Sequence, residues 1–162
     1  MNQDGTRSLW SVVWKLWLPI LMEYEGLYLR PYLCPAGVWT IALGLTFYPN
    51  GQPVRPTDPA LTREQALALS EEIAMRFFLQ VLPLVSLKTA GSWTAVTDFC
   101  FNVGIGAFKT STLRRRILAG QYELVPAEFR RWTKAGGRTL RGLVRRAEIR
   151  VALFNRPEAP IA

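Results

Sequence analysis

The sequence predicts an α+β fold that is mainly helical and has two lobes. Residues 27–54, near the N-terminus, are rich in β-branched and aromatic residues and contain the turn sequence Pro-Asn-Gly. Residues 62–83 place apolar side chains at helical spacing over about five turns. Helix signals dominate the rest of the chain. These three observations indicate a small β lobe, a long connecting helix and a helical lobe.

At 162 residues the chain has the length of one ordinary domain. We assign residues 1–162 to that single domain. Within it, we expect the first helix and the β lobe over about 1–61, the connecting helix over 62–83 and the helical lobe over 84–162. A helix of this length is suited to joining two lobes that each bury a small core.

The N-terminal segment Leu9–Met22 is strongly apolar, contains three tryptophans and is interrupted by Lys15 and Pro19. Its 14 residues are too few to cross a bilayer, which takes roughly 20 residues. No small-residue cleavage site of a signal peptide follows it. We interpret it as an amphipathic or buried helix, with membrane contact as the less favoured alternative. Because proline fits the first turn of a helix, we expect the first helix from about Pro19 to Tyr24.

The β lobe is predicted to contain strands around 27–33 and 37–43, followed by the Pro-Asn-Gly turn of a hairpin. A proline-rich loop then leads to the connecting helix. Thr62 and Gln65 have the spacing of a capping box at the start of that helix, and Pro83 marks its end.

Four helical segments are predicted in the second lobe. The first, 92–103, is so apolar that we expect it to be central. The last, 141–154, is amphipathic, with arginines on one face that we expect to be solvated. Between them we predict a helix that is capped by Ser111 and ended by Gly120, a shorter helix at 125–132 and a loop at 134–137.

The charge of the chain is basic and unevenly distributed. The formal net charge is +8, and twelve of the twenty Lys and Arg residues lie between Arg114 and Arg156. This distribution is typical of a protein with a polyanionic partner, such as nucleic acid, an acidic membrane surface or an anionic wall polymer. A solvated helical surface explains it equally well.

The residue types that are absent exclude several chemistries. The chain has no histidine, which removes the usual general base and the commonest metal ligand, and excludes Ser-His-Asp and Cys-His nucleophiles. Its two cysteines, Cys34 and Cys100, lack zinc spacing and are too few for a disulfide framework. We therefore expect no metal and no cofactor. Proton chemistry in this chain depends on carboxylates, thiol, tyrosine or lysine.

The stretch EYEGLYLRPYLCPAGVWT, from Glu23 to Thr40, contains the candidate catalytic residues. Glu25 ends the first predicted helix among apolar neighbours, a setting in which a carboxyl group can act as general acid. If the chain then forms a hairpin, Cys34 and Thr40 both project into a groove beside the helix end. A thiol and a hydroxyl there could hold a water opposite the acid, as in an inverting glycosidase. Taken singly, a surface Glu and a buried structural Cys are the simpler interpretations.

Three segments in order carry a family resemblance: EGLYLRPYLCPAGVWTI, FNVGIGAFKTSTLRRRI and EFRRWTKAGGRTLRGLVRRAEIRVALF. They resemble the catalytic segment, the Phe-Asn-x-Gly-x-Gly-x-Phe segment and the Trp-x-x-x-Gly-Gly…Gly-Leu-x-x-Arg-Arg ending of phage-type lysozymes, the endolysins of glycoside hydrolase family 24. In that family the catalytic Glu is followed by Asp or Cys and then Thr at the spacing of Glu25, Cys34 and Thr40. The resemblance covers about Ile20 to Phe154.

The resemblance implies a lysozyme-like fold with a cleft between its lobes. It also implies cleavage of the β-1,4 bond between N-acetylmuramic acid and N-acetylglucosamine in peptidoglycan. Glu25 would be the general acid, and Cys34 and Thr40 would position or activate the attacking water. Three further residues match segments that are expected to contact the substrate: Phe101, Asn102 and Gly142. The expected protein is a monomer that is made in the host cytoplasm and acts on the cell wall after release.

The chain departs from the family pattern just after Thr40. The segment reads TIALGLT, so Ala42 replaces a glycine and Leu45 replaces a polar residue. If Ala42 adopts a positive φ, it is strained, and Leu45 loses polar bonds but can pack. We expect a cost in local stability or altered lobe geometry.

Three other functions stay open from the sequence. The departure at TIALGLT favours a peptidoglycan-binding module that is catalytically impaired. The basic half of the chain suggests nucleic-acid binding, although it contains no nucleic-acid motif. The final basic helix suggests membrane disruption, although such a helix is more often an ordinary packed one whose basic face is solvated.

Overall fold

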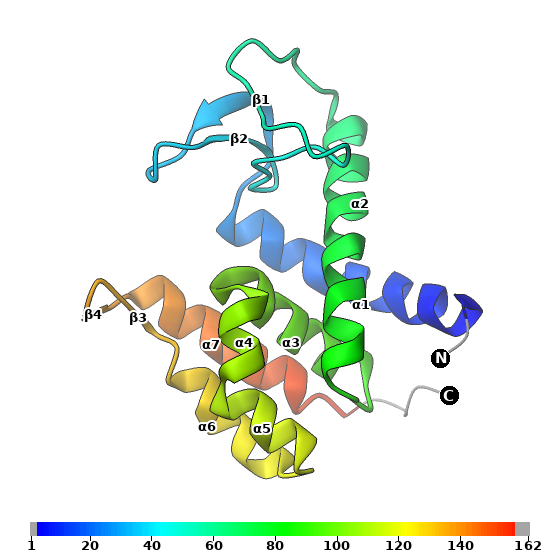
Figure 1. The fold of residues 1–162 in the computed structure, drawn as a ribbon, viewed down its shortest axis with the longest axis vertical. Coiled ribbons are helices and arrows are strands. Elements are labelled where there is room, and N and C mark those ends of the chain that lie inside the picture. The colour runs from blue at the N-terminus through cyan, green and yellow to red at the C-terminus, as the bar shows by residue number, and fades with distance from the viewer. Residues whose placement is uncertain (1–2, 158–162) are drawn as a thin grey trace. The chain divides into compact units, whose positions relative to one another are not determined.

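The computed structural model describes residues 3–157 and divides the chain into two units. The hairpin unit is Trp17–Arg76, and the helical unit combines the chain up to Leu16 with the chain from Phe77 onward. The division falls inside two helices, α1 (Gln3–Tyr24) and α2 (Arg63–Val81), so each of them contributes to both units. Figure 1 shows the order of the elements along the chain. The predicted α+β class is confirmed.

Helix α1 is much longer than the sequence predicts. It begins at Gln3 and contains Pro19 in its interior, so the prediction that it begins near Pro19 is wrong. A proline inside a helix costs roughly 3 kcal/mol. Burial of Trp10, Val13 and Trp17, each 5% exposed or less, offsets this cost, because each large apolar side chain contributes about 1.5–3 kcal/mol. Within residues 3–157, no helix has the length and apolar character needed to span a membrane.

The hairpin unit contains the predicted strands. β1 (Tyr28–Leu33) and β2 (Trp39–Ala42) are antiparallel, with Tyr32 opposite Thr40. The Pro-Asn-Gly turn follows, where the Tyr48 N–H donates to the Gln52 carbonyl oxygen at 2.9 Å. The core of the unit is a cluster of small and branched apolar residues from β2, the loop after it and α2: Ile41, Ala42, Leu45, Val54 and Ala66.

Helix α2 starts at the predicted capping box. The Gln65 N–H donates to Thr62 Oγ1 at 3.2 Å, and the Thr62 N–H donates to Gln65 Oε1 at 2.8 Å. This reciprocal pair satisfies two donors at the helix end. A 3-10 turn, η1 (Leu82–Leu84), follows α2 at the proline that was expected to end it.

The helical unit is arranged around α3 (Ala90–Val103). Every residue from Ala90 to Cys100 is buried, which confirms that this apolar segment is central. α7 (Arg141–Phe154) packs against it, and the two helices approach closely at Gly91, where a Cβ atom would lie 2.3 Å from the Leu153 carbonyl oxygen. The intervening elements are α4 (Ile105–Thr110), α5 (Thr112–Leu118), η2 (Tyr122–Leu124) and α6 (Val125–Arg130).

Two details of the helical unit bear on the sequence predictions. Ser111 caps α5 as predicted, since its Oγ accepts from the Arg114 N–H at 3.1 Å. The predicted loop at 134–137 is instead part of a small hairpin of β3 (Lys134–Ala135) and β4 (Arg138–Thr139). Gly136 and Gly137 form its two-residue turn with φ of 55° and 75°, a backbone that favours tight hairpins.

The arginines of α7 correct a second expectation. The sequence predicts a solvated basic face, but Arg146 and Arg150 are 4% and 0% exposed. Both bind the buried carboxylate of Asp98 on α3. Part of the basic C-terminal half is therefore an internal structural element.

Ala42 adopts the left-handed backbone that the glycine of the family pattern would adopt. Its φ is 53°, and its methyl group is fully buried in the core of the hairpin unit. This conformation costs an L-residue roughly 1–2 kcal/mol. Burial of the methyl group stabilises the folded chain by about 0.8 kcal/mol. Leu45 is 5% exposed and packs into the same core, as predicted.

The Ala42→Gly variant is expected to change the free energy of unfolding by less than about 1 kcal/mol. Relief of strain is opposed by the lost methyl burial and by the greater freedom of glycine in the unfolded chain. Ala42→Val is expected to destabilise by about 3 kcal/mol, because a β-branched residue is strained at positive φ and overfills a buried site. Urea unfolding followed by tryptophan fluorescence measures both changes. Equal destabilisation by glycine and valine would contradict this account of the strain.

Candidate active site

Glu25 directly follows α1 and lies against the loop after β2. Its N–H still donates to the Leu21 carbonyl oxygen at 2.8 Å, and Gly26 then leaves the helix with φ of 71°. The half-buried side chain packs on Gly44, which has φ of 77°. A Cβ atom on Gly44 would lie 3.1 Å from Glu25 Oε2 and 3.4 Å from Cγ. Gly44 therefore provides both the turn and the space for the carboxylate.

Cys34 occupies the first position of the turn between β1 and β2. The Gly37 N–H donates to the Cys34 carbonyl oxygen at 2.8 Å, and the Cys34 N–H donates to the Val38 carbonyl oxygen at 3.0 Å. Pro35 and Gly37 occupy the positions of such a turn at which proline and glycine are favoured. Hydrogen bonds from the backbone of Val38 and then Ala36 outweigh desolvation and hold the pKa of the Cys34 thiol below its usual value. The turn therefore stabilises a thiolate.

Thr40 lies on β2 beside this turn and is 3% exposed. Its Oγ1 donates to the Val38 carbonyl oxygen at 3.0 Å. The same hydroxyl can donate to the sulfur of Cys34, an interaction that also lowers the pKa of the thiol. A threonine hydroxyl has one hydrogen, so it can serve only one of these acceptors at a time. When the hydrogen is on Val38, the Thr40 oxygen keeps its lone pairs for another donor.

Tyr32 lies near both Glu25 and Cys34. Burial, followed by the neighbouring groups of Tyr28, Cys34 and Glu25, raises the pKa of its phenol. The rings of Tyr28 and Tyr32 are 4.0 Å apart between centroids, with 31° between their planes. Glu25 and Cys34 therefore both lie within electrostatic reach of one phenol. Glu25, Cys34 and Thr40 all belong to the hairpin unit.

The other three predicted site residues belong to the helical unit. Phe101 and Asn102 lie in the last turn of α3, and Gly142 is the second residue of α7. The Phe101 ring packs edge-on to Phe77, with 5.6 Å between centroids. Gly142 is exposed, and a Cβ atom there would meet nothing within 4 Å. In the described part of the chain, no group of His, Cys, Asp and Glu side chains is arranged to hold a metal ion.

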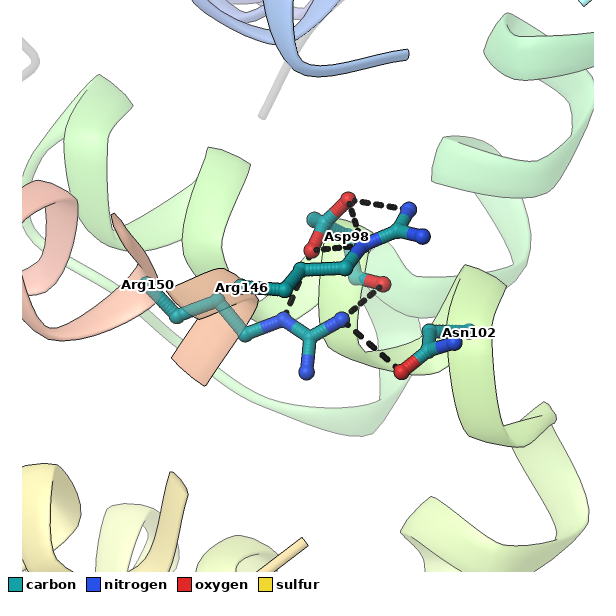
Figure 2. Close-up of polar contacts among 4 residues, drawn as sticks. All are labelled: Asp98, Asn102, Arg146 and Arg150. Atoms are coloured by element: carbon teal, nitrogen blue, oxygen red, sulfur yellow. Dashed lines mark hydrogen bonds and ion pairs between the residues drawn. The ribbon is translucent and has the colours of Figure 1, made fainter. Parts of the chain in front are cut away.

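Asn102 is part of a buried polar cluster that sequence reasoning missed (Figure 2). Asp98 Oδ1 accepts from Arg146 Nη2 at 2.8 Å, and Asp98 Oδ2 accepts from Arg150 Nε at 2.6 Å. Arg150 Nη2 then donates to Asn102 Oδ1 at 3.1 Å. We call Asp98, Asn102, Arg146 and Arg150 the Asp98 cluster.

A signal for this cluster is present in the sequence. Asp98 is the one ionisable carboxylate in the otherwise apolar segment SWTAVTDFCFNV. A carboxylate in a buried helix needs a cationic partner, and a chain without histidine can supply only Lys or Arg. The sequence does not indicate which of its many arginines are these partners.

Alkylation rates are expected to separate the two cysteines. Cys34 should react with iodoacetamide in the native protein, with a half-maximal rate below the pH of about 8.5 that is typical of a free thiol, because the reactive species is the thiolate. Cys100 is fully buried, and burial raises the pKa of its thiol to about 12, so it should react only after unfolding. Mass spectrometry of the labelled peptides against pH measures both rates.

The matched variant for this experiment is Thr40→Val. It removes one hydrogen bond that stabilises the thiolate, so the midpoint of Cys34 alkylation should move to higher pH. A midpoint at or above that of a free thiol in the wild-type protein would contradict the geometry of the turn.

Known proteins resemble this chain in sequence and in fold. The phage lysozyme family model matches residues 22–150. An endolysin of Acyrthosiphon pisum secondary endosymbiont phage 1 is 39% identical over 142 residues, which is 85% of this chain and 93% of that protein. An endolysin of Bacillus phage PZA is 32% identical, and the match covers 84% of this chain but only 52% of that longer protein.

A solved structure supports the same assignment. The endolysin from the Escherichia coli phage FAHEc1 has a TM-score of 0.78 and 25% identity, over 90% of this chain and 94% of that chain. The resemblance drawn from the three sequence motifs is thereby confirmed. Since the family match extends over most of its length, this chain belongs to the phage lysozyme family of glycosidases.

Proposed function

We propose that this lysozyme hydrolyses peptidoglycan at the β-1,4 bond between N-acetylmuramic acid and N-acetylglucosamine. Glu25 is the general acid, and Cys34 and Thr40 hold and activate the attacking water. The observation that carries the proposal is the turn that holds Cys34, in which backbone hydrogen bonds lower the pKa of the thiol beside the hydroxyl of Thr40.

The carboxyl group of Glu25 supplies the proton for the leaving group. Its position is fixed from both sides, since the helical hydrogen bond to Leu21 anchors its backbone and Gly44 supports its side chain. Fixing a catalytic group in this way supports efficient proton transfer, because small displacements of a reacting group reduce the rate strongly.

Thr40 and Cys34 act on the attacking water in different ways. With its hydrogen on the Val38 carbonyl, the Thr40 oxygen accepts a hydrogen bond from the water and orients it. The Cys34 thiolate accepts the second hydrogen of the water and acts as base. The backbone bonds from Val38 and Ala36 lower the pKa of the thiol and so favour its thiolate form.

The reaction then balances as a single displacement. The water oxygen bonds to the anomeric carbon, and the bond from that carbon to the bridging oxygen breaks. Glu25 protonates the bridging oxygen, and Cys34 takes the proton of the water. Attack opposite the leaving group inverts the anomeric configuration. Exchange of protons with solvent restores both groups.

Three residues of the helical unit are proposed to contact the glycan: Phe101, Asn102 and Gly142. Each is half-buried or exposed. The net charge of +8 suits an anionic wall, so no nucleic-acid partner is needed to explain it. We propose a monomer that is made in the host cytoplasm and acts on the wall after release. A catalytically impaired wall-binding module on the same fold is the alternative.

Clearing of a bacterial cell-wall suspension tests the roles of the acid and the thiol. Glu25→Gln is expected to reduce the clearing rate by at least about 100-fold, because general acid catalysis contributes roughly 10²–10⁴. Cys34→Ser should also lose most activity. Cys34→Asp should retain activity and extend it to lower pH, because a carboxylate is ionised where a thiol is not.

Binding to walls is measured for the same proteins by pelleting. If Glu25→Gln clears walls as fast as the wild type, then Glu25 is not the acid, and lysis at full strength would indicate membrane disruption. A wild-type protein that pellets with walls without clearing them would establish the alternative, the impaired binding module.

A pair of glycine variants tests whether Gly44 positions the carboxylate of Glu25. Gly44→Ala should reduce clearing by about 100-fold, because the added Cβ displaces the carboxylate. Gly51→Ala is the matched control, since Gly51 has a similar φ of 82° and a Cβ there would meet nothing within 4 Å. Both variants should lose about 1–2 kcal/mol of stability, but only Gly44→Ala should lose activity. Equal activity in the two variants would remove Gly44 from the site.

A further inference from the structure

The Asp98 cluster extends from the interior of the helical unit to a proposed glycan contact (Figure 2). At its inner end, the side chains of Asp98 and Arg150 are 1% and 0% exposed. Arg150 donates through Nε to Asp98 Oδ2 at 2.6 Å and through Nη2 to the Asp98 carbonyl oxygen at 3.3 Å. These two bonds to one residue fix the plane of the guanidinium group.

The outer end of the cluster is the side-chain amide of Asn102. Arg150 Nη2 donates to Asn102 Oδ1 at 3.1 Å. An arginine side chain carries only donors, so the amide must present its oxygen to Arg150. The oxygen and the nitrogen of an amide leave its carbon in different directions, and Nδ2 points away from Arg150, as Figure 2 shows. Asn102 is only half-buried, in contrast to the arginine that orients it.

We propose that Arg150 is a positioning residue, which acts through Asn102 to present Nδ2 as a hydrogen-bond donor to the glycan. The acceptor is a glycan oxygen, and the acetamido carbonyl is the strongest uncharged acceptor on an N-acetylated sugar. This inference rests on the proposed function, because it gives a chemical direction to the proposed contact at Asn102. Without Arg150 the amide can rotate by half a turn and present an acceptor to an acceptor.

Arg146 provides an internal comparison for Arg150. It lies one turn earlier on α7, is 4% exposed and binds the same carboxylate, with Nε at 3.2 Å and 3.1 Å from the two oxygens of Asp98. It is Arg150 that donates to Asn102. Substitution of either arginine by lysine keeps the charge and disturbs the same buried ion pair, but only the change at Arg150 removes the bond that orients the amide.

A double-mutant cycle tests the inference, with affinity for glycan as the readout. The probe is a soluble peptidoglycan strand of alternating N-acetylmuramic acid and N-acetylglucosamine. Dissociation constants are measured in the Glu25→Gln background, so that the strand stays intact. Asn102→Ala and Arg150→Lys should each weaken binding by about 3- to 10-fold, the usual value of one hydrogen bond. Together they should weaken it no further than either alone.

Two controls separate positioning from a general loss of structure. Arg146→Lys should lower the melting temperature about as much as Arg150→Lys but leave the dissociation constant unchanged. Asn102→Asp keeps an oxygen toward Arg150 and replaces the donor by a second acceptor. It should therefore bind the strand as weakly as Asn102→Ala without a lower melting temperature, and this result stands even if Arg150→Lys fails to fold.

Additive effects of Asn102→Ala and Arg150→Lys would overturn the inference, as would unchanged affinity in Asn102→Asp. Failure of the proposed function gives a different result. In that case the wild-type protein does not clear cell walls, but the affinities of the variants for the glycan strand can still be compared.

Discussion

The buried carboxylate of Asp98 is the constraint on which the helical unit depends. Burial alone would raise its pKa, but the guanidinium groups of Arg150 and Arg146 together hold the pKa below its usual value. Removing one partner of such a buried pair typically costs about 3–5 kcal/mol, because the remaining charge has lost its compensation. The pair fixes α7 on α3 in one register. The close approach of Gly91 to Leu153 fixes the other end of the same helix pair.

The hairpin unit is organised by backbone conformation instead of buried charge. Three residues of the segment 37–44, namely Gly37, Ala42 and Gly44, have positive φ. Gly37 closes the turn that holds the thiol, and Gly44 makes room for the acid. Ala42 shows that the segment tolerates a side chain at one of these positions, because its methyl group is buried in the core. At Ala42 the strain of the left-handed backbone is therefore partly offset by burial of the methyl group.

The two units make different contributions to one proposed chemistry. A chain without histidine lacks the usual general base, and the turn at Cys34 is proposed to supply one, because backbone donors there lower the pKa of the thiol. In the helical unit, the buried Asp98 cluster ends at Asn102, whose side-chain oxygen accepts a hydrogen bond from Arg150. In both units a flexible polar group is oriented by rigid neighbours, which is the usual requirement for efficient catalysis and recognition.

Local signals in the sequence determined the α+β class, the capping box of α2, the N-cap of α5, the central position of α3 and the hairpin that carries Cys34 and Thr40. These features depend on short-range periodicity and turn chemistry, which a sequence displays directly. The length of α1 and the burial of Arg146 and Arg150 were decided only by the tertiary structure. Pro19 is a local signal to start or stop a helix, but buried tryptophans elsewhere on α1 outweigh it. An arginine on an amphipathic helix looks solvated until a carboxylate distant in sequence is placed against it, and that pairing of Asp98 with α7 exists only in the folded chain.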